Sequence, residues 1–142
     1  MALRTLDALG SLGGKVVGAR LDLNVPLDGS SITDDGRIHA ALPTLQALAD
    51  AGARMVLMSH LGRPDGRFAP AFSLGPVAKR LSELWPSSVH FTDAVVGQEV
   101  AEAIDTLGPG ELLLVGNLRF DPRETSKNQA ERGAFASELA AP

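Results

Sequence analysis

Apolar residues along this chain form short continuous runs that alternate with longer stretches of helical spacing. The short runs predict four buried strands, over residues 15–22, 54–58, 89–91 and 111–115. Apolar positions three and four residues apart predict helices over residues 38–49, 74–84 and 100–107, and a last helix through Phe135 and Leu139. The run at 54–58 is apolar after Arg54, as expected of a parallel strand covered by helices on both faces.

Alternating strands and helices predict an α/β fold: a doubly wound, Rossmann-like parallel sheet with helices on both faces. The expected helix caps are Asp34 or Asp35, Ser73, and a capping box of Asn128 with Glu131. The sequence stops where a helix would lead into another strand, so we expect a sheet that is incomplete at its C-terminal end. The strand at 111–115 is then a candidate for a bare edge.

Composition and charge narrow the class of protein. The 142 residues fit one domain, and the hydrophobic share of 44% is ordinary for a globular protein. A net charge of -4 disfavours a nucleic-acid-binding surface, and the absence of cysteine excludes disulfides and thiolate chemistry. No apolar stretch approaches transmembrane length, and charges interrupt the N-terminus, so we expect a cytoplasmic protein without a signal peptide or membrane partner.

Three short basic stretches each follow a predicted strand. They are Arg20-Leu-Asp-Leu-Asn24, Ser59-His-Leu-Gly-Arg-Pro64 and Asn117-Leu-Arg-Phe120. Ligands of open α/β sheets bind outside the carboxyl ends of the strands. Guanidinium and imidazole groups gathered there would suit a small, highly anionic ligand.

The first stretch is open to two interpretations. In an extended segment Arg20, Asp22 and Asn24 point to one face, where they could bind a polyhydroxylated acid. The alternative is a structural pair of Arg20 with Asp22 at the end of a strand.

The other two stretches are equally open when each is taken alone. His60 and Arg63 could clamp a phosphate or carboxylate on a turn where Gly62 allows close approach, or they could be ordinary loop residues. Arg119 could bind an anion, be solvated, or pair with Asp121. Taken together, several cations at the same end of different strands favour an anion site.

Arg37 opens the first predicted helix, where the helix dipole mildly disfavours a cation. Its placement there is a hint that the charge has a functional role.

The sequence lacks the motifs that are typical of other chemistries. We find no Gly-rich phosphate loop, no Gly-x-Gly-x-x-Gly, no serine elbow and no metal-ligand constellation, since the three histidines lie in different predicted elements.

These residues resemble the N-terminal domain of phosphoglycerate kinase, from about Lys15 to the C-terminus. The segments that carry the resemblance are 20–26, 32–38, 41–44, 56–64, 73–78 and 117–120. The resemblance implies a basic patch that binds 3-phosphoglycerate or 1,3-bisphosphoglycerate, with Arg37 as the catalytic residue that stabilises the transferring phosphoryl group. The substrate-binding residues that it implies are Asp22, Leu23, Asn24, Arg37, His60, Leu61, Gly62, Arg63 and Arg119.

The resemblance also implies that residues 1–142 are part of an N-terminal substrate-binding domain. Family members continue with further strands and a C-terminal domain that binds Mg-ADP or Mg-ATP, so we expect this chain to hold no nucleotide and to be inactive alone. Gly116 stands where the family usually has Glu, and the loss of Glu could leave the strand end looser and an arginine unpaired.

Two other interpretations stay open. One is a non-catalytic binding module for small phosphorylated acids. The other is a self-associating piece, although full-length family members are usually monomeric.

Overall fold

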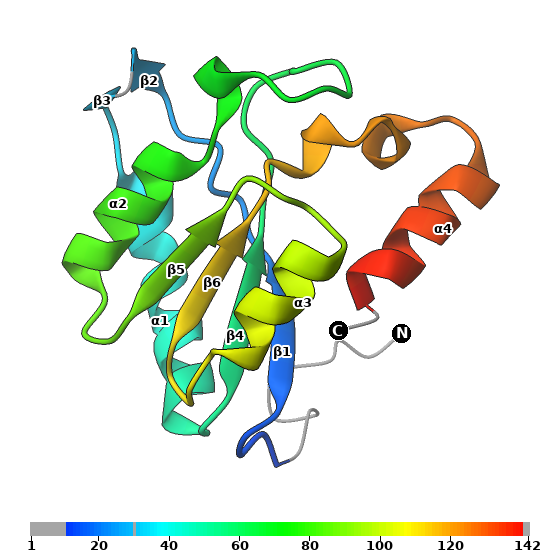
Figure 1. The fold of residues 1–142 in the computed structure, drawn as a ribbon. Coiled ribbons are helices and arrows are strands. Elements are labelled where there is room, and N and C mark those ends of the chain that lie inside the picture. The colour runs from blue at the N-terminus through cyan, green and yellow to red at the C-terminus, as the bar shows by residue number, and fades with distance from the viewer. Residues whose placement is uncertain (1–10, 30, 141–142) are drawn as a thin grey trace, which may run out of the picture.

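The computed structural model describes residues 11–29 and 31–140, in which four parallel strands form one sheet (Figure 1). The sheet order is β1-β4-β6-β5. The strands are β1 (Val16–Arg20), β4 (Arg54–Met58), β6 (Leu112–Val115) and β5 (Val89–Thr92). The predicted parallel α/β sheet is confirmed.

The order of the strands corrects one expectation. β6 is not a bare edge, because it lies between β4 and β5 and pairs with both. Its sequence, Leu-Leu-Leu-Val, is buried throughout, as suits a strand with neighbours on both sides and helices on both faces. Within the described residues the edge strands are β1 and β5.

Helices lie on both faces of the sheet (Figure 1). α1 (Gly36–Asp50) and α2 (Gly75–Leu84) pack on the larger core, which includes Met55, Leu57, Leu112 and Leu114. α3 (Gln98–Asp105) packs on a smaller core on the opposite face, and α4 (Gln129–Ala140) lies beside it. Successive strand residues alternate between the two cores, as the period of a strand requires.

The helix caps follow the sequence prediction only in part. Asp35 makes no capping hydrogen bond; its carboxylate instead binds Arg80 and His39. Asp34 accepts a hydrogen bond from the backbone N–H of Gly36 at 2.8 Å. The hydroxyl of Ser73 accepts one from the N–H of Gly75 at 3.1 Å.

The predicted capping box of α4 is half formed. Asn128 Oδ1 accepts a hydrogen bond from the N–H of Ala130 at 2.9 Å. The carboxylate of Glu131 accepts from the hydroxyl of Ser126 rather than from the N–H of Asn128. The hydroxyl of Ser126 therefore supplies the other half of the cap.

Several short elements that the sequence did not predict lie beyond the carboxyl ends of the strands (Figure 1). They are the hairpin of β2 (Leu27–Asp28) and β3 (Ser31–Ile32) and the 3₁₀ turns η2 (Pro70–Phe72), η3 (Leu118–Phe120) and η4 (Pro122–Thr125). Within the described residues, no helix is long and apolar enough to cross a membrane.

Candidate functional site

The three basic segments meet beyond the carboxyl ends of β1, β4 and β6. Ser59, directly after β4, belongs to the second segment and holds the other two. Its hydroxyl accepts from the N–H of Leu23 at 2.9 Å, and its carbonyl accepts from the N–H of Leu118 at 3.0 Å. Asn24 Oδ1 also accepts from the N–H of Gly62 at 3.2 Å. Hydrogen bonds between backbone and side chains thus bring together segments that are far apart in the sequence.

Arg20 and Asp22 do not pair with each other. β1 ends at Arg20, whose guanidinium binds both carboxylate oxygens of Glu124, at 2.6 and 3.2 Å. Asp22 accepts from Arg37 Nη1 at 3.0 Å. Glu124 was not predicted as a partner, because nothing in its local sequence connects it with a residue 104 positions earlier.

Arg37 lies in the first turn of α1 and reaches back to the first segment. Its Nη1 also donates to the carbonyl oxygen of Asn24 at 2.5 Å. Its side chain is 53% exposed. A cavity of about 530 Å³ lies beside it, lined by Asn24, Val25, Pro26, Asp34, Gly36 and Arg37.

Leu23 and Leu61 contribute to this region differently from their charged neighbours. Both side chains are buried in the larger core, so only their backbone groups are available to a ligand. Gly62 has φ +58, and a Cβ there would lie 2.5 Å from the ring of Phe72. Glycine is required here by its own backbone and by the packing of Phe72.

Arg63 and Arg119 line a second cavity of about 350 Å³, together with Pro64, Asp65, Gly66 and Thr125. Arg119 Nη1 donates to the carbonyl of Gly62 at 3.2 Å, while its Nε is buried without a partner among the described residues. The alternative pairing of Arg119 with Asp121 is wrong, because Asp121 pairs with Arg123 at 2.7 Å.

His60 is partly buried and lies near enough to Arg119 for the two charges to interact. Burial lowers the pKa of its imidazole, and the charge of Arg119 lowers it further, while Asp22 acts in the opposite direction. The ring is therefore mostly neutral near pH 7 when no anion is bound. An anion beside it would favour protonation.

Asn117 is a buried residue that sequence analysis passed over. Its Nδ2 donates to the carbonyls of Leu61 and Phe72 at 2.6 and 3.1 Å, and its Oδ1 accepts from the N–H of Arg119 at 3.0 Å. The only signal in the sequence is its place in the motif Asn-Leu-Arg-Phe.

Gly116 does not leave the strand end loose. Its N–H donates to the carbonyls of Thr92 and Ala94, both at 3.1 Å. Its φ of +89 suits glycine, and a Cβ would lie 2.8 Å from the backbone nitrogen of Leu118.

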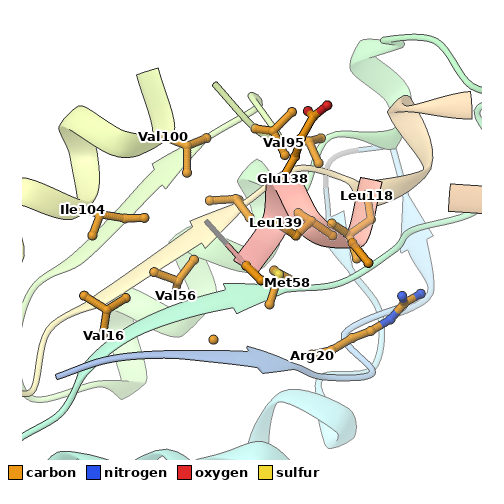
Figure 2. Close-up of a pocket in the computed structure, with 15 residues that line it drawn as sticks. Val16, Arg20, Val56, Met58, Val95, Val100, Ile104, Leu118, Glu138 and Leu139 are labelled. Atoms are coloured by element: carbon orange, nitrogen blue, oxygen red, sulfur yellow. The ribbon is translucent and has the colours of Figure 1, made fainter. Parts of the chain in front are cut away.

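A third cavity, of about 430 Å³, has a different chemistry (Figure 2). Figure 2 shows Val16, Val56 and Ile104 on one side and Leu139 of α4 on the other, with Arg20 at one end. These walls suit apolar groups, so we do not place the anion site here. In residues 11–29 and 31–140, no three histidine or acidic side chains gather closely enough to hold a metal ion.

The fold and the site define a class: a doubly wound α/β domain with cationic side chains gathered at the carboxyl ends of its parallel strands. Residues 6–142 match the family model of phosphoglycerate kinase. The chain belongs to the phosphoglycerate kinase family.

Curated relatives agree with this assignment. The chain is 57% identical over 141 residues to the phosphoglycerate kinase of Leifsonia xyli subsp. xyli, and 54% identical over 140 residues to that of Streptomyces coelicolor. These alignments cover 99% and 97% of this chain but 35% of each relative. The chain therefore spans about a third of the length of the relatives that it matches.

Solved structures show the same fold. The crystal structure of phosphoglycerate kinase from Pyrococcus horikoshii superposes with a TM-score of 0.82 at 28% identity, covering 96% of this chain and 33% of that one. The structure from Coxiella burnetii gives a TM-score of 0.71 at 34% identity, covering 94% of this chain and 32% of that one.

Proposed function

We propose that this chain is the substrate-binding half of a phosphoglycerate kinase of glycolysis. The complete cytoplasmic enzyme would transfer a phosphoryl group from the acyl phosphate of 1,3-bisphosphoglycerate to ADP, giving 3-phosphoglycerate and ATP. Residues 1–142 would belong to the N-terminal domain, and Mg-ADP or Mg-ATP would be held by a part of the enzyme outside this sequence.

One observation carries the proposal: His60, Arg63 and Arg119 gather at one end of the sheet. Neither arginine forms an ion pair among the described residues, whereas Arg20, Arg37, Arg80 and Arg123 all do. Cations left without carboxylate partners are suited to a ligand that brings its own negative charges.

The remaining residues would orient the ligand. Asp22 and Asn24 present a carboxylate and an amide suited to the glycerate end. Arg37 lies beside both and is half exposed, so its guanidinium could turn from Asp22 toward a phosphoryl group and stabilise charge on the equatorial oxygens. These roles are the catalytic and binding part of the proposal.

Titration calorimetry with 3-phosphoglycerate tests the binding half of the proposal. We expect saturable binding by the unchanged chain and loss of detectable binding in the double variant Arg37→Ala, Arg63→Ala. Arg132→Ala is the matched control, because Arg132 is an exposed arginine of α4, away from the site. Equal affinity of the double variant and the unchanged chain would overturn the proposed site.

A coupled assay of ATP production tests the catalytic half. We expect no turnover by this chain with 1,3-bisphosphoglycerate and Mg-ADP, because the nucleotide would have no site on it. Measurable turnover would overturn that expectation. Equal binding of a range of small phosphorylated acids would instead favour the alternative of a non-catalytic binding module.

A further inference from the structure

We infer that Asn117 is a positioning residue that holds Arg119 and the segment His60–Arg63 in the geometry needed to bind an anion. The inference rests on the proposed function and deepens it. Asn117 has no contact with solvent, since its exposed fraction is 0%, so it acts through its neighbours rather than on a ligand.

Every side-chain hydrogen bond of Asn117 goes to the backbone of the loops around the site. Its Oδ1 fixes the N–H of Arg119, two residues further on, at 3.0 Å. Its Nδ2 fixes the carbonyl of Leu61 at 2.6 Å, directly before Gly62, and that of Phe72 at 3.1 Å. The amide therefore joins the loop after β6 to the loop after β4.

These contacts form a closed circuit. Leu61 leads to Gly62, whose carbonyl accepts a hydrogen bond from Arg119 Nη1 at 3.2 Å. Arg119 leads back through its own N–H to Asn117. Phe72, the other residue that Asn117 holds, also packs against Gly62. One side chain thus fixes both ends of the contact between Arg119 and Gly62.

An amide is needed at this place because both a donor and an acceptor are used. Asn117 follows the apolar strand β6, and an apolar side chain here would leave the carbonyl of Leu61 and the N–H of Arg119 buried without partners. The loops would have to move to recover water or other partners. Such a movement shifts the guanidinium of Arg119, and it would weaken binding without removing any charge.

The test compares Asn117→Ala with Thr92→Val. Thr92 is the matched control: it is also a buried polar residue at the end of a strand, but its hydroxyl bonds to Glu99 and to the N–H of Ala94, and to neither Arg119 nor the loop after β4. We expect both variants to lower the thermal midpoint. Only Asn117→Ala should weaken the binding of 3-phosphoglycerate, by roughly 10-fold or more.

A double-mutant cycle separates positioning from a general loss of stability. If Asn117 acts partly through Arg119, then Asn117→Ala should cost less affinity in a chain that already carries Arg119→Ala than in the unchanged chain. Additive effects would overturn the inference, and so would equal losses of affinity in Asn117→Ala and Thr92→Val. If the alanine variant does not fold, Asn117→Ser carries the same comparison.

Amide hydrogen exchange gives a readout that needs no ligand. The N–H of Arg119 should be protected in the unchanged chain and in Thr92→Val, and should exchange faster in Asn117→Ala. If the unchanged chain does not bind 3-phosphoglycerate, the proposed function fails, while this measurement still decides the role of Asn117. An unchanged exchange rate of the Arg119 N–H in Asn117→Ala would overturn the positioning role of Asn117.

Discussion

The arginines near the carboxyl end of the sheet fall into two groups that differ in what surrounds them. Arg20 and Arg123 each bind carboxylates, Arg20 at Glu124 and Arg123 at Asp121 and Glu138. Arg63 and Arg119 form no ion pair in the described part of the chain. The first group joins loops and a helix together, whereas the second makes no such bridge and is the group that we propose to bind the ligand. Pairing alone does not mark the site, because Arg37 pairs with Asp22 and still belongs to the proposed site.

The largest effect on binding should come from the second group. Arg119→Ala removes a cation that lines the cavity next to Arg63. A hydrogen bond to a charged group contributes about 1.5–3 kcal/mol, which corresponds to a roughly 10- to 100-fold weaker Kd. Calorimetric titration with 3-phosphoglycerate measures this loss, with Arg132→Ala as the control. A change of less than threefold in Kd would contradict the proposed difference in role between the two groups of arginines.

In the first group, Arg123→Ala should affect stability rather than binding. The Arg123 guanidinium joins η4 to α4 through Glu138 and lies 5.1 Å from the centre of the Phe135 ring. It also lowers the pKa of Asp121 and Glu138. These two carboxylates therefore stabilise the fold when the pH is above their ordinary pKa values, and this contribution is lost as the pH falls through their folded pKa values.

The measurement is thermal unfolding of Arg123→Ala at pH 7 and at pH 4. We expect a lower midpoint than in the unchanged chain, with a smaller difference at pH 4. An unchanged midpoint at pH 7 would contradict the structural role of the first group. Arg132→Ala, on the same helix, is the control.

His60 should give a smaller effect that depends on pH. Its folded pKa lies below the ordinary value of 6.5, so below about pH 6.5 the unfolded chain binds the proton more readily than the folded chain. The free energy of unfolding should therefore decrease as the pH falls from 7 toward the folded pKa. It should decrease less in the His60→Gln variant. Urea unfolding midpoints at pH 7.5 and 5.5 measure the difference. Identical pH dependence in both proteins would show that His60 does not contribute.

The smallest effect should follow from converting a paired arginine into an unpaired one. Glu124→Gln removes the negative charge that holds Arg20, so Arg20 becomes available to an anion. We expect 3-phosphoglycerate to bind a few-fold more tightly at low ionic strength, and the gain to shrink with added salt. Glu102→Gln, on the exposed surface of α3, is the control. Weaker binding would indicate that Arg20 needs Glu124 to be held in place.

Local sequence patterns could predict the elements but not their neighbours. The apolar runs predicted the four strands of the parallel sheet, because burial between helices leaves little room for polar residues. The position of β6 between β4 and β5 was missed, because strand order depends on contacts between distant segments.

The same limit explains the missed partners in the site. Asp35 follows the rule for a helix cap, but its carboxylate binds Arg80, 45 positions away. Glu124 pairs with Arg20 across 104 positions. The gathering of His60, Arg63 and Arg119 was predictable, because parallel strands deliver their carboxyl ends to one edge of the sheet.

The contact between Gly62 and Phe72 has a consequence for evolution. A methyl group at position 62 would overlap the Phe72 ring, and the backbone there has a positive φ, so two separate constraints act on one codon. A smaller side chain at 72 relieves the first constraint but not the second. Among homologous sequences, glycine should therefore persist at position 62 even where the aromatic ring at position 72 has been replaced.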